Sequence, residues 1–140
     1  MQPLASAPLM SWLAVAVGSA AGGLARYGCG LWIASRIDSG FPWATLFVNV
    51  TGSFLIGLVA ALTDPSGRWA AAPVLRELLM VGVLGGYTTF SAFSLQTFAL
   101  LREGRVAFAV ANVSASVALC LVVVWLGYLA GASFKSASAF

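Results

Sequence analysis

Four long apolar stretches limit what this chain can fold into more than any other feature of its sequence. They cover about residues 8–34, 43–63, 73–101 and 106–130, and each is bounded by charged residues, proline or glycine. A helix needs about 20 apolar residues to cross a bilayer, and each stretch is long enough. We therefore predict an all-α membrane protein in which residues 1–140 form a single domain of four transmembrane helices.

Composition supports this prediction and excludes several other classes of protein. Of the residues, 61% are hydrophobic and only 8% are charged, whereas a soluble domain carries about 25% charged residues.

The chain has no histidine, which removes the usual metal ligand and neutral-pH proton carrier. We expect no enzymatic activity. Cys29 and Cys120 lie in apolar stretches, where cysteine behaves as a small buried hydrophobe. The scattered basic residues form no nucleic-acid patch, and none precedes Arg26, so we expect no signal peptide.

The basic residues outside the spans are balanced between the two ends of the predicted bundle. With four spans, both termini and the loop between spans two and three lie on one side. That side carries Arg68, Arg76 and Lys135, and the opposite side carries Arg36, Arg102 and Arg105. This balance gives the positive-inside rule no preferred orientation. We expect the chain to insert both ways and to pair as an antiparallel dimer; one orientation fixed by something other than charge is the alternative.

Small residues recur four positions apart in several of the spans. The pairs are Gly18 with Gly22, Ser19 with Gly23, Gly82 with Gly86, and Gly127 with Gly131. Such pairs let helix backbones approach closely in lipid, so they predict helix-packing faces. The segment after Ala130 is rich in serine and alanine and is expected to be a frayed terminus.

Ionisable residues are nearly absent from the middle of the spans. All four acids lie at or near the predicted span ends: Asp38, Asp64, Glu77 and Glu103. A proton-coupled carrier would use a carboxylate within the membrane, so this placement argues against one. Arg26 is the only cation deep within a span. Its side chain either extends to the interface or gives a water-filled vestibule a positive potential that attracts anions.

Uncharged polar residues cluster in spans two and four. Thr45 and Asn49 lie one helical turn apart, as do Asn112 and Ser116. An intramembrane asparagine commonly bonds a neighbouring helix, and a serine can bond back to its own helix. The amide of Asn49 also offers two donor hydrogens, which a dehydrated anion needs. Structural and ion-binding roles are both open at this point.

The third span contains the least helical segment of the chain. Residues 85–94 read GGYTTFSAFS, a combination with low helix propensity. Irregular backbone at membrane depth is tolerated only where protein or a water-filled cavity satisfies it, and broken spans commonly serve ion sites. We therefore predict a third helix broken mid-membrane. Phe90 and Phe93 can share a face after the break, where their positive ring edges suit an anion path; packing in the core is the alternative.

Three segments together resemble a known family. They are Gly22–Tyr27 (GGLARY), Thr45–Phe54 (TLFVNVTGSF) and Gly82–Ser94 (GVLGGYTTFSAFS). In this order and at this spacing they resemble the signatures of the CrcB/Fluc fluoride channels. The resemblance implies an antiparallel, dual-topology homodimer in the cell (inner or plasma) membrane, with two fluoride pores and a central structural sodium ion (Na+). A separately encoded sister subunit is the alternative partner, which the balanced charges disfavour.

The resemblance also implies roles for individual residues. Main-chain carbonyls of Gly85 and Thr88 would hold the sodium ion, and Arg26 would lie in the vestibule. The fluoride pore would be lined from spans two, three and four by Asn49, Thr89, Phe90, Ser91, Phe93 and Ser116, the last preferred to Ser114. Two residues depart from the family pattern. Gln96 stands where family members often have an acidic residue, and Ala92 stands where they have a threonine, so one hydroxyl is lost from the row of hydroxyl groups along the pore.

The leading functional hypothesis is a passive, fluoride-selective channel that exports fluoride from the cytoplasm and lowers its intracellular concentration. A selective pore must replace the water around fluoride with close donors and still release the ion, which suits neutral donors. One alternative is a small four-span dual-topology exporter of drugs or cations, which would need a mid-membrane carboxylate. The other is a structural or assembly subunit, for which the polar segment of span three has no evident use.

Overall fold

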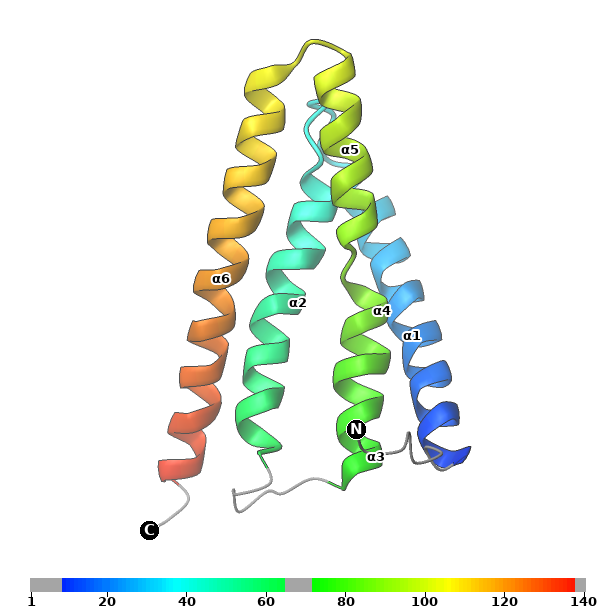
Figure 1. The fold of residues 1–140 in the computed structure, drawn as a ribbon, viewed down its shortest axis with the longest axis vertical. Helices are drawn as coiled ribbons and strands as arrows, with labels where there is room; N and C mark the ends of the chain where they lie inside the picture. The colour runs from blue at the N-terminus through cyan, green and yellow to red at the C-terminus, as the bar shows by residue number, and fades with distance from the viewer. Residues whose placement is uncertain (1–8, 65–71, 138–140) are drawn as a thin grey trace, which may run out of the picture.

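The computed structural model describes residues 9–64 and 72–137, which form helices joined by short connections and no strand (Figure 1). The elements are α1 (Leu9–Ala34), α2 (Trp43–Leu62), α3 (Pro73–Arg76), η1 (Glu77–Leu84), α4 (Gly85–Tyr87), α5 (Phe90–Arg102) and α6 (Val106–Ala137). Four stretches are long and apolar enough to cross a membrane: Leu9–Ala34, Trp43–Leu62, Pro73–Arg102 and Val106–Phe134. The predicted all-α class and its four candidate spans are confirmed for the described part of the chain.

The ends of the helices mostly follow the sequence signals. Pro73 occupies the first helical position of α3, where its missing N–H costs nothing. The largest difference lies at the last helix, which continues to Ala137, so the expectation of a frayed terminus after Ala130 is wrong for residues 131–137. Alanine and serine do not stop a helix, and the Ser133 hydroxyl donates to the Leu129 carbonyl of the same helix at 2.9 Å.

Glycine lets α1 pack directly against the backbone of η1. A Cβ atom at Gly18 would lie 2.7 Å from the Leu78 carbonyl oxygen and 2.9 Å from the Gly82 Cα. One turn later, a Cβ at Gly22 would overlap the carbonyl of Val83. The two backbones therefore touch along two turns, as the small-residue pairs predict.

The second closely packed pair is α2 with α6, and here too glycine lets the two backbones touch. A Cβ at Gly57 of α2 would overlap the Val124 carbonyl, and a Cβ at Gly127 of α6 would overlap the Phe54 carbonyl. Gly23 differs from these, because a Cβ there would meet nothing within 4 Å. The chain thus consists of two tightly packed helix pairs, with α5 reaching across to α6 (Figure 1).

The loop between α1 and α2 lies at the same end of the bundle as the turn between α5 and α6 (Figure 1). Arg105 joins them: its guanidinium donates to the Gly40 carbonyl at 2.8 Å and lies 4.4 Å from the centre of the Phe108 ring. Gly40 has a φ of +64° and Gly104 a φ of +73°, values that glycine adopts without strain. The start of α1 and the end of α6 lie at the other end.

Two residues between α4 and α5 have extended rather than helical backbone. Thr88 has φ −84° and ψ 159°, and Thr89 has φ −153° and ψ 115°. Before them, η1 is a π-helix of eight residues, a wider helical form that is frequent at functional sites. The chain from Pro73 to Arg102 therefore contains a π-helical stretch followed by an extended dipeptide, and these two features position the site.

The glycine contacts give a stability prediction. Gly57→Ala places a methyl group against the Val124 carbonyl, and we expect it to cost about 1–3 kcal/mol. Gly23→Ala is the matched control, because its methyl group meets no neighbour and alanine favours a helix by about 1 kcal/mol. Melting temperatures of the purified protein in detergent should fall for Gly57→Ala and stay level or rise for Gly23→Ala. Equal shifts in both variants would contradict the packing described.

Candidate functional site

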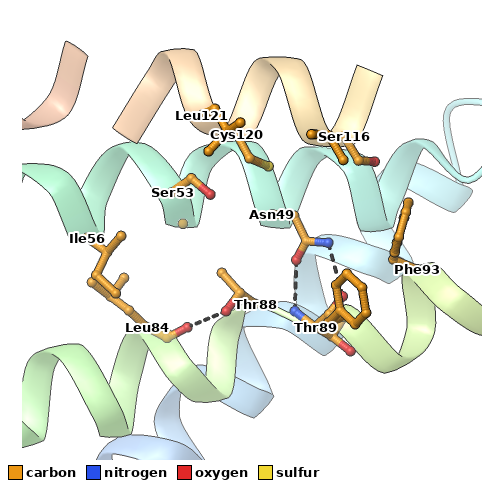
Figure 2. A pocket seen from close by; sticks show the side chains of 13 residues that line it. Asn49, Ser53, Ile56, Leu84, Thr88, Thr89, Phe93, Ser116, Cys120 and Leu121 are labelled. Carbon is orange, nitrogen blue, oxygen red and sulfur yellow. Dashed lines mark hydrogen bonds between the residues drawn. The ribbon is translucent and has the colours of Figure 1, made fainter. Parts of the chain in front are cut away.

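A groove of about 430 Å³ lies where α2, α5 and α6 meet the extended dipeptide (Figure 2). Its lining comprises Asn49, Gly52, Ser53, Ile56, Leu84, Thr88, Thr89, Phe90, Phe93, Ser116, Val117, Cys120 and Leu121. The wall is mostly apolar, with a few polar groups gathered near the extended residues. Six of the nine residues predicted from the sequence line this groove; Gly85, Ser91 and Arg26 do not.

Asn49 holds the extended segment through a reciprocal pair of hydrogen bonds. Its Nδ2 donates to the Thr89 carbonyl at 3.0 Å, and the Thr89 N–H donates to its Oδ1 at 2.8 Å (Figure 2). The side chain therefore satisfies both main-chain groups of a residue that has left the helix, groups that would otherwise be costly to bury. Nδ2 carries two hydrogens, so one remains for another acceptor.

This bonding pattern frees two particular carbonyls. In an α-helix the Gly85 carbonyl would accept from Thr89 N–H, and the Thr88 carbonyl from Ala92 N–H. Here Thr89 N–H donates to Asn49, and Ala92 N–H donates to the Thr89 hydroxyl at 3.2 Å. The carbonyls of Gly85 and Thr88 thus lose their usual helical donors, and they are the two carbonyls that the family resemblance assigns to sodium.

Arg26 reaches the same segment from the α1 side. Its Nη1 donates to the Thr88 carbonyl at 3.3 Å, and the residue is half-buried. A cation is favourable there, because the helix that starts at Pro73 presents its negative end near Tyr87. Arg26 therefore contacts the main chain beside the groove rather than lining the groove itself.

The two predicted phenylalanines have different surroundings. Phe93 is buried, with 9% of its surface exposed, whereas Phe90 is 78% exposed. Their ring centres lie 5.3 Å apart with the planes tilted by 44°. Both rings border the groove. Phe93 therefore also serves as core packing, while Phe90 points to a face that the chain itself leaves open.

Of the three hydroxyl side chains predicted to line the pore, Thr89 and Ser116 lie in the groove wall and Ser91 does not. Thr89 is the N-cap of α5, and its hydroxyl oxygen lies 3.2 Å from the hydroxyl oxygen of Ser91. Ser91 itself is exposed. The Ser116 hydroxyl is buried in the groove wall and has no hydrogen-bond partner within the described residues. Ser114 lies instead in a separate, smaller hollow of about 220 Å³ between α5 and α6. Ser116, the serine preferred from the sequence as a pore residue, thus lies in the groove wall, and Ser114 does not.

Three polar side chains outside the groove lining received no specific role from the sequence: Asn112 and Gln96, which it singled out, and Tyr87, which it did not. Asn112 is 1% exposed and donates to the Thr97 hydroxyl at 2.9 Å, tying α6 to α5. Gln96, the departure from the family pattern, has its Oε1 buried and unpartnered within the described ranges. Tyr87 bonds two other helices through its hydroxyl. Its position inside the GGYTTF segment was the only signal available for it.

The fold and the groove define a multi-pass membrane protein whose helices surround a largely apolar groove with a few polar groups. A family described as "CrcB-like protein, Camphor Resistance (CrcB)" matches residues 13–128. The chain belongs to this CrcB family, which is a family of ion channels and not of enzymes.

Curated relatives support this assignment. The Rhodopseudomonas palustris protein "Fluoride-specific ion channel FluC 1" is 53% identical over 115 residues, 82% of each chain. The Opitutus terrae "Fluoride-specific ion channel FluC" is 48% identical over 89% of this chain and 95% of its own length. The Rhodospirillum rubrum protein of the same name is 50% identical over 86% of this chain and 93% of its own length.

The Asn49 contacts give a prediction about local order. Asn49→Ala leaves the Thr89 N–H and carbonyl without their partners, at a cost of about 1–3 kcal/mol. We expect faster amide hydrogen exchange in peptides covering residues 85–95, measured by mass spectrometry on the purified protein. Ser53→Ala, which also changes a polar residue of the groove wall, is the control and should leave exchange there unchanged. Unaltered exchange in Asn49→Ala would mean that Asn49 does not hold this segment.

Proposed function

We propose that this protein is a fluoride-selective channel that passively exports fluoride from the cytoplasm. The observation that carries the proposal is the groove, in which the amide of Asn49, the Ser116 hydroxyl and the ring of Phe93 come together. The names of its relatives point to the same ion. Passive export would lower the intracellular fluoride concentration.

The polar groups of the groove suit a small anion that must also leave. Asn49 retains one donor hydrogen, and the buried Ser116 hydroxyl can donate its own. The positive edge of Phe93 adds a weak attraction without a full charge. Neutral donors of this kind replace hydration while binding the ion weakly enough for release. Arg26, near the Thr88 carbonyl, adds positive potential close to the groove.

Main-chain carbonyls of Gly85 and Thr88 would hold a structural sodium ion. Carbonyl oxygens are ligands that hard cations accept, and both have lost their usual helical donors because Thr89 and Ala92 donate elsewhere. A carbonyl has two lone pairs, so the contact from Arg26 to Thr88 leaves one available. A bound sodium ion would neutralise the partial negative charge of these freed groups.

Two carbonyls from one chain are too few for a sodium shell, which favours a dimer. Gly85 lies on an exposed face, where an added Cβ would meet only the Met80 carbonyl oxygen at 3.6 Å. A freed carbonyl facing lipid is expensive, so a second copy of the chain covering this face would satisfy it. The balanced basic residues favour an antiparallel partner, giving a homodimer with one fluoride pore per chain.

The alternative function, a proton-coupled exporter of drugs or cations, finds no support in the placement of the acids. Asp38 lies between α1 and α2, Asp64 follows α2, Glu77 begins η1, and Glu103 follows α5. Each lies near an end of the bundle. A carboxylate in the middle of a span would have favoured that function.

Fluoride flux tests the proposal directly. Liposomes that contain the protein and are loaded with fluoride should release the fluoride without a proton gradient, as recorded by a fluoride electrode. Liposomes loaded with chloride should retain it. Phe93→Ile and Phe90→Ile should slow release by about tenfold, the effect of roughly 1.4 kcal/mol on a barrier. Phe98→Ile, on the same helix but outside the groove wall, is the matched control and should conduct normally.

Two outcomes would count against the channel. No fluoride release from the unaltered protein, or release that requires a proton gradient, would contradict the function itself. Normal release from both Phe90→Ile and Phe93→Ile would remove the phenylalanines from the ion path while leaving the function in place.

Cross-linking tests the antiparallel dimer. In a chain carrying Cys29→Ser and Cys120→Ser, we expect Gly85→Cys to be joined to a second copy by a short thiol cross-linker. Ile37→Cys, exposed at one end of the bundle, should not cross-link, because the two copies would place it on opposite sides of the membrane. An impermeant thiol reagent should label a part of Ile37→Cys in intact cells and the rest in inside-out membrane vesicles. Efficient cross-linking of Ile37→Cys would instead indicate a parallel pair.

A further inference from the structure

Tyr87 is the last residue of α4, directly before the extended dipeptide, and its hydroxyl contacts two other helices. The hydroxyl oxygen lies 3.0 Å from the Thr51 hydroxyl of α2 and 3.7 Å from the Cys29 sulfur of α1. One side chain thus connects the end of α4 to both neighbouring spans. The described function uses neither Tyr87 nor these partners.

The hydrogen bonds of the Tyr87 hydroxyl continue into the main chain of α2. The Thr51 hydroxyl has one hydrogen, and carbonyls of Phe47 and Val48 lie 2.8 Å and 3.4 Å from its oxygen. When Thr51 donates to one of them, its oxygen accepts from the Tyr87 O–H, and the Tyr87 oxygen can accept the thiol hydrogen of Cys29. Cys29, Tyr87 and Thr51 thus form a hydrogen-bonded relay that ends at the α2 backbone.

Glycines on both sides hold the body of Tyr87 in place. A Cβ at Gly52 of α2 would lie 3.2 Å from the Tyr87 ring, so the ring rests on bare backbone. On the α1 side, a Cβ at Gly22 would lie 2.8 Å from the Tyr87 amide nitrogen. The ring, the backbone and the hydroxyl of Tyr87 are therefore each in contact with a neighbouring helix.

This end of α4 carries the carbonyls assigned to sodium. Thr88 is bonded to Tyr87, and Gly85 lies two residues before it. Asn49 holds the other side of the segment through Thr89. The backbone of α4 also packs on α1, since a Cβ at Gly86 would lie 2.6 Å from the Ser19 carbonyl oxygen. The Tyr87 hydroxyl adds the hydrogen-bonded link from this segment to α2 and to Cys29.

We propose that Tyr87 is a positioning residue that sets the affinity of the Gly85 and Thr88 carbonyls for sodium. The hydroxyl, held between Cys29 and Thr51, keeps those carbonyls in the arrangement that a cation needs. This inference rests on the proposed function, because it concerns the sodium site of the same channel. It assigns a role to three residues that touch neither ion.

Sodium titration of thermal stability tests this role without measuring flux. A bound ion raises the melting temperature of the purified protein saturably, with N-methylglucamine replacing sodium at constant ionic strength. Tyr87→Phe keeps the ring and loses the hydroxyl, and we expect its half-saturating sodium concentration to rise about fivefold, the effect of one lost hydrogen bond. Tyr27→Phe, an exposed tyrosine on α1, is the matched control and should titrate as the unaltered protein does.

Further variants separate positioning from a general loss of stability. Thr51→Val should shift the titration in the same direction, and adding it to Tyr87→Phe should shift it no further, since both break one relay. Cys29→Ala should give a smaller shift, and Cys29→Ser, which restores a donor, should largely reverse it. If Tyr87→Phe does not fold, the comparison of Cys29→Ala with Cys29→Ser still tests the proposal.

The outcomes are distinguishable from those of the fluoride test. A Tyr87→Phe or Cys29→Ala titration that matches the unaltered protein, or a melting temperature indifferent to sodium, would overturn the positioning role. At saturating sodium we expect Tyr87→Phe to release fluoride within about twofold of the unaltered rate, because a small shift in affinity is then compensated by mass action. Absence of fluoride release from the unaltered protein would overturn the function instead.

Discussion

The reciprocal hydrogen bonds between the Asn49 side chain and the Thr89 main chain are the contact on which the candidate site depends. Asn49 satisfies both polar groups of a residue with extended backbone, at 3.0 Å and 2.8 Å. Because Thr89 N–H donates to α2, the Gly85 carbonyl loses its helical donor, and the Thr89 hydroxyl takes the Ala92 N–H in turn. One amide on α2 thus both stabilises an irregular segment and leaves polar oxygens available beside the groove.

The packing of the spans keeps that segment where Asn49 can reach it. In lipid there is little hydrophobic drive between helices, so close backbone contact and hydrogen bonds hold them together. Bare backbone at Gly18 and Gly22 joins α1 to η1, and Gly57 and Gly127 join α2 to α6. The end of α4 is held between these two pairs. A groove between α2, α5 and α6 follows, because α5 leaves α4 after the extended dipeptide and packs against α6 instead (Figure 2).

Local signals in the sequence were enough to predict the four helices and part of the site. Apolar length fixes the spans because the bilayer sets how long an apolar helix must be, and polar residues such as Asn49 and Ser116 stand out within them. The contact of Arg26 with Thr88 could not be predicted, because it depends on how α1 is rotated about its axis. The π-helical turns of η1 likewise have no local signal: ELLMVGVL contains ordinary helix formers and one glycine. Which residues of different helices lie close together depends on tertiary packing, and a single sequence does not reveal that packing.

The most direct test of the whole account is the initial rate of fluoride release from liposomes, compared between the unaltered protein and Asn49→Leu at equal reconstituted amounts. Leucine is close to asparagine in size but forms neither bond to Thr89. The account predicts sodium-supported fluoride release from the unaltered protein and release at least about tenfold slower from Asn49→Leu, a loss of roughly 1.4 kcal/mol or more. Equal rates for the two proteins would contradict the central role given to the contact between Asn49 and Thr89.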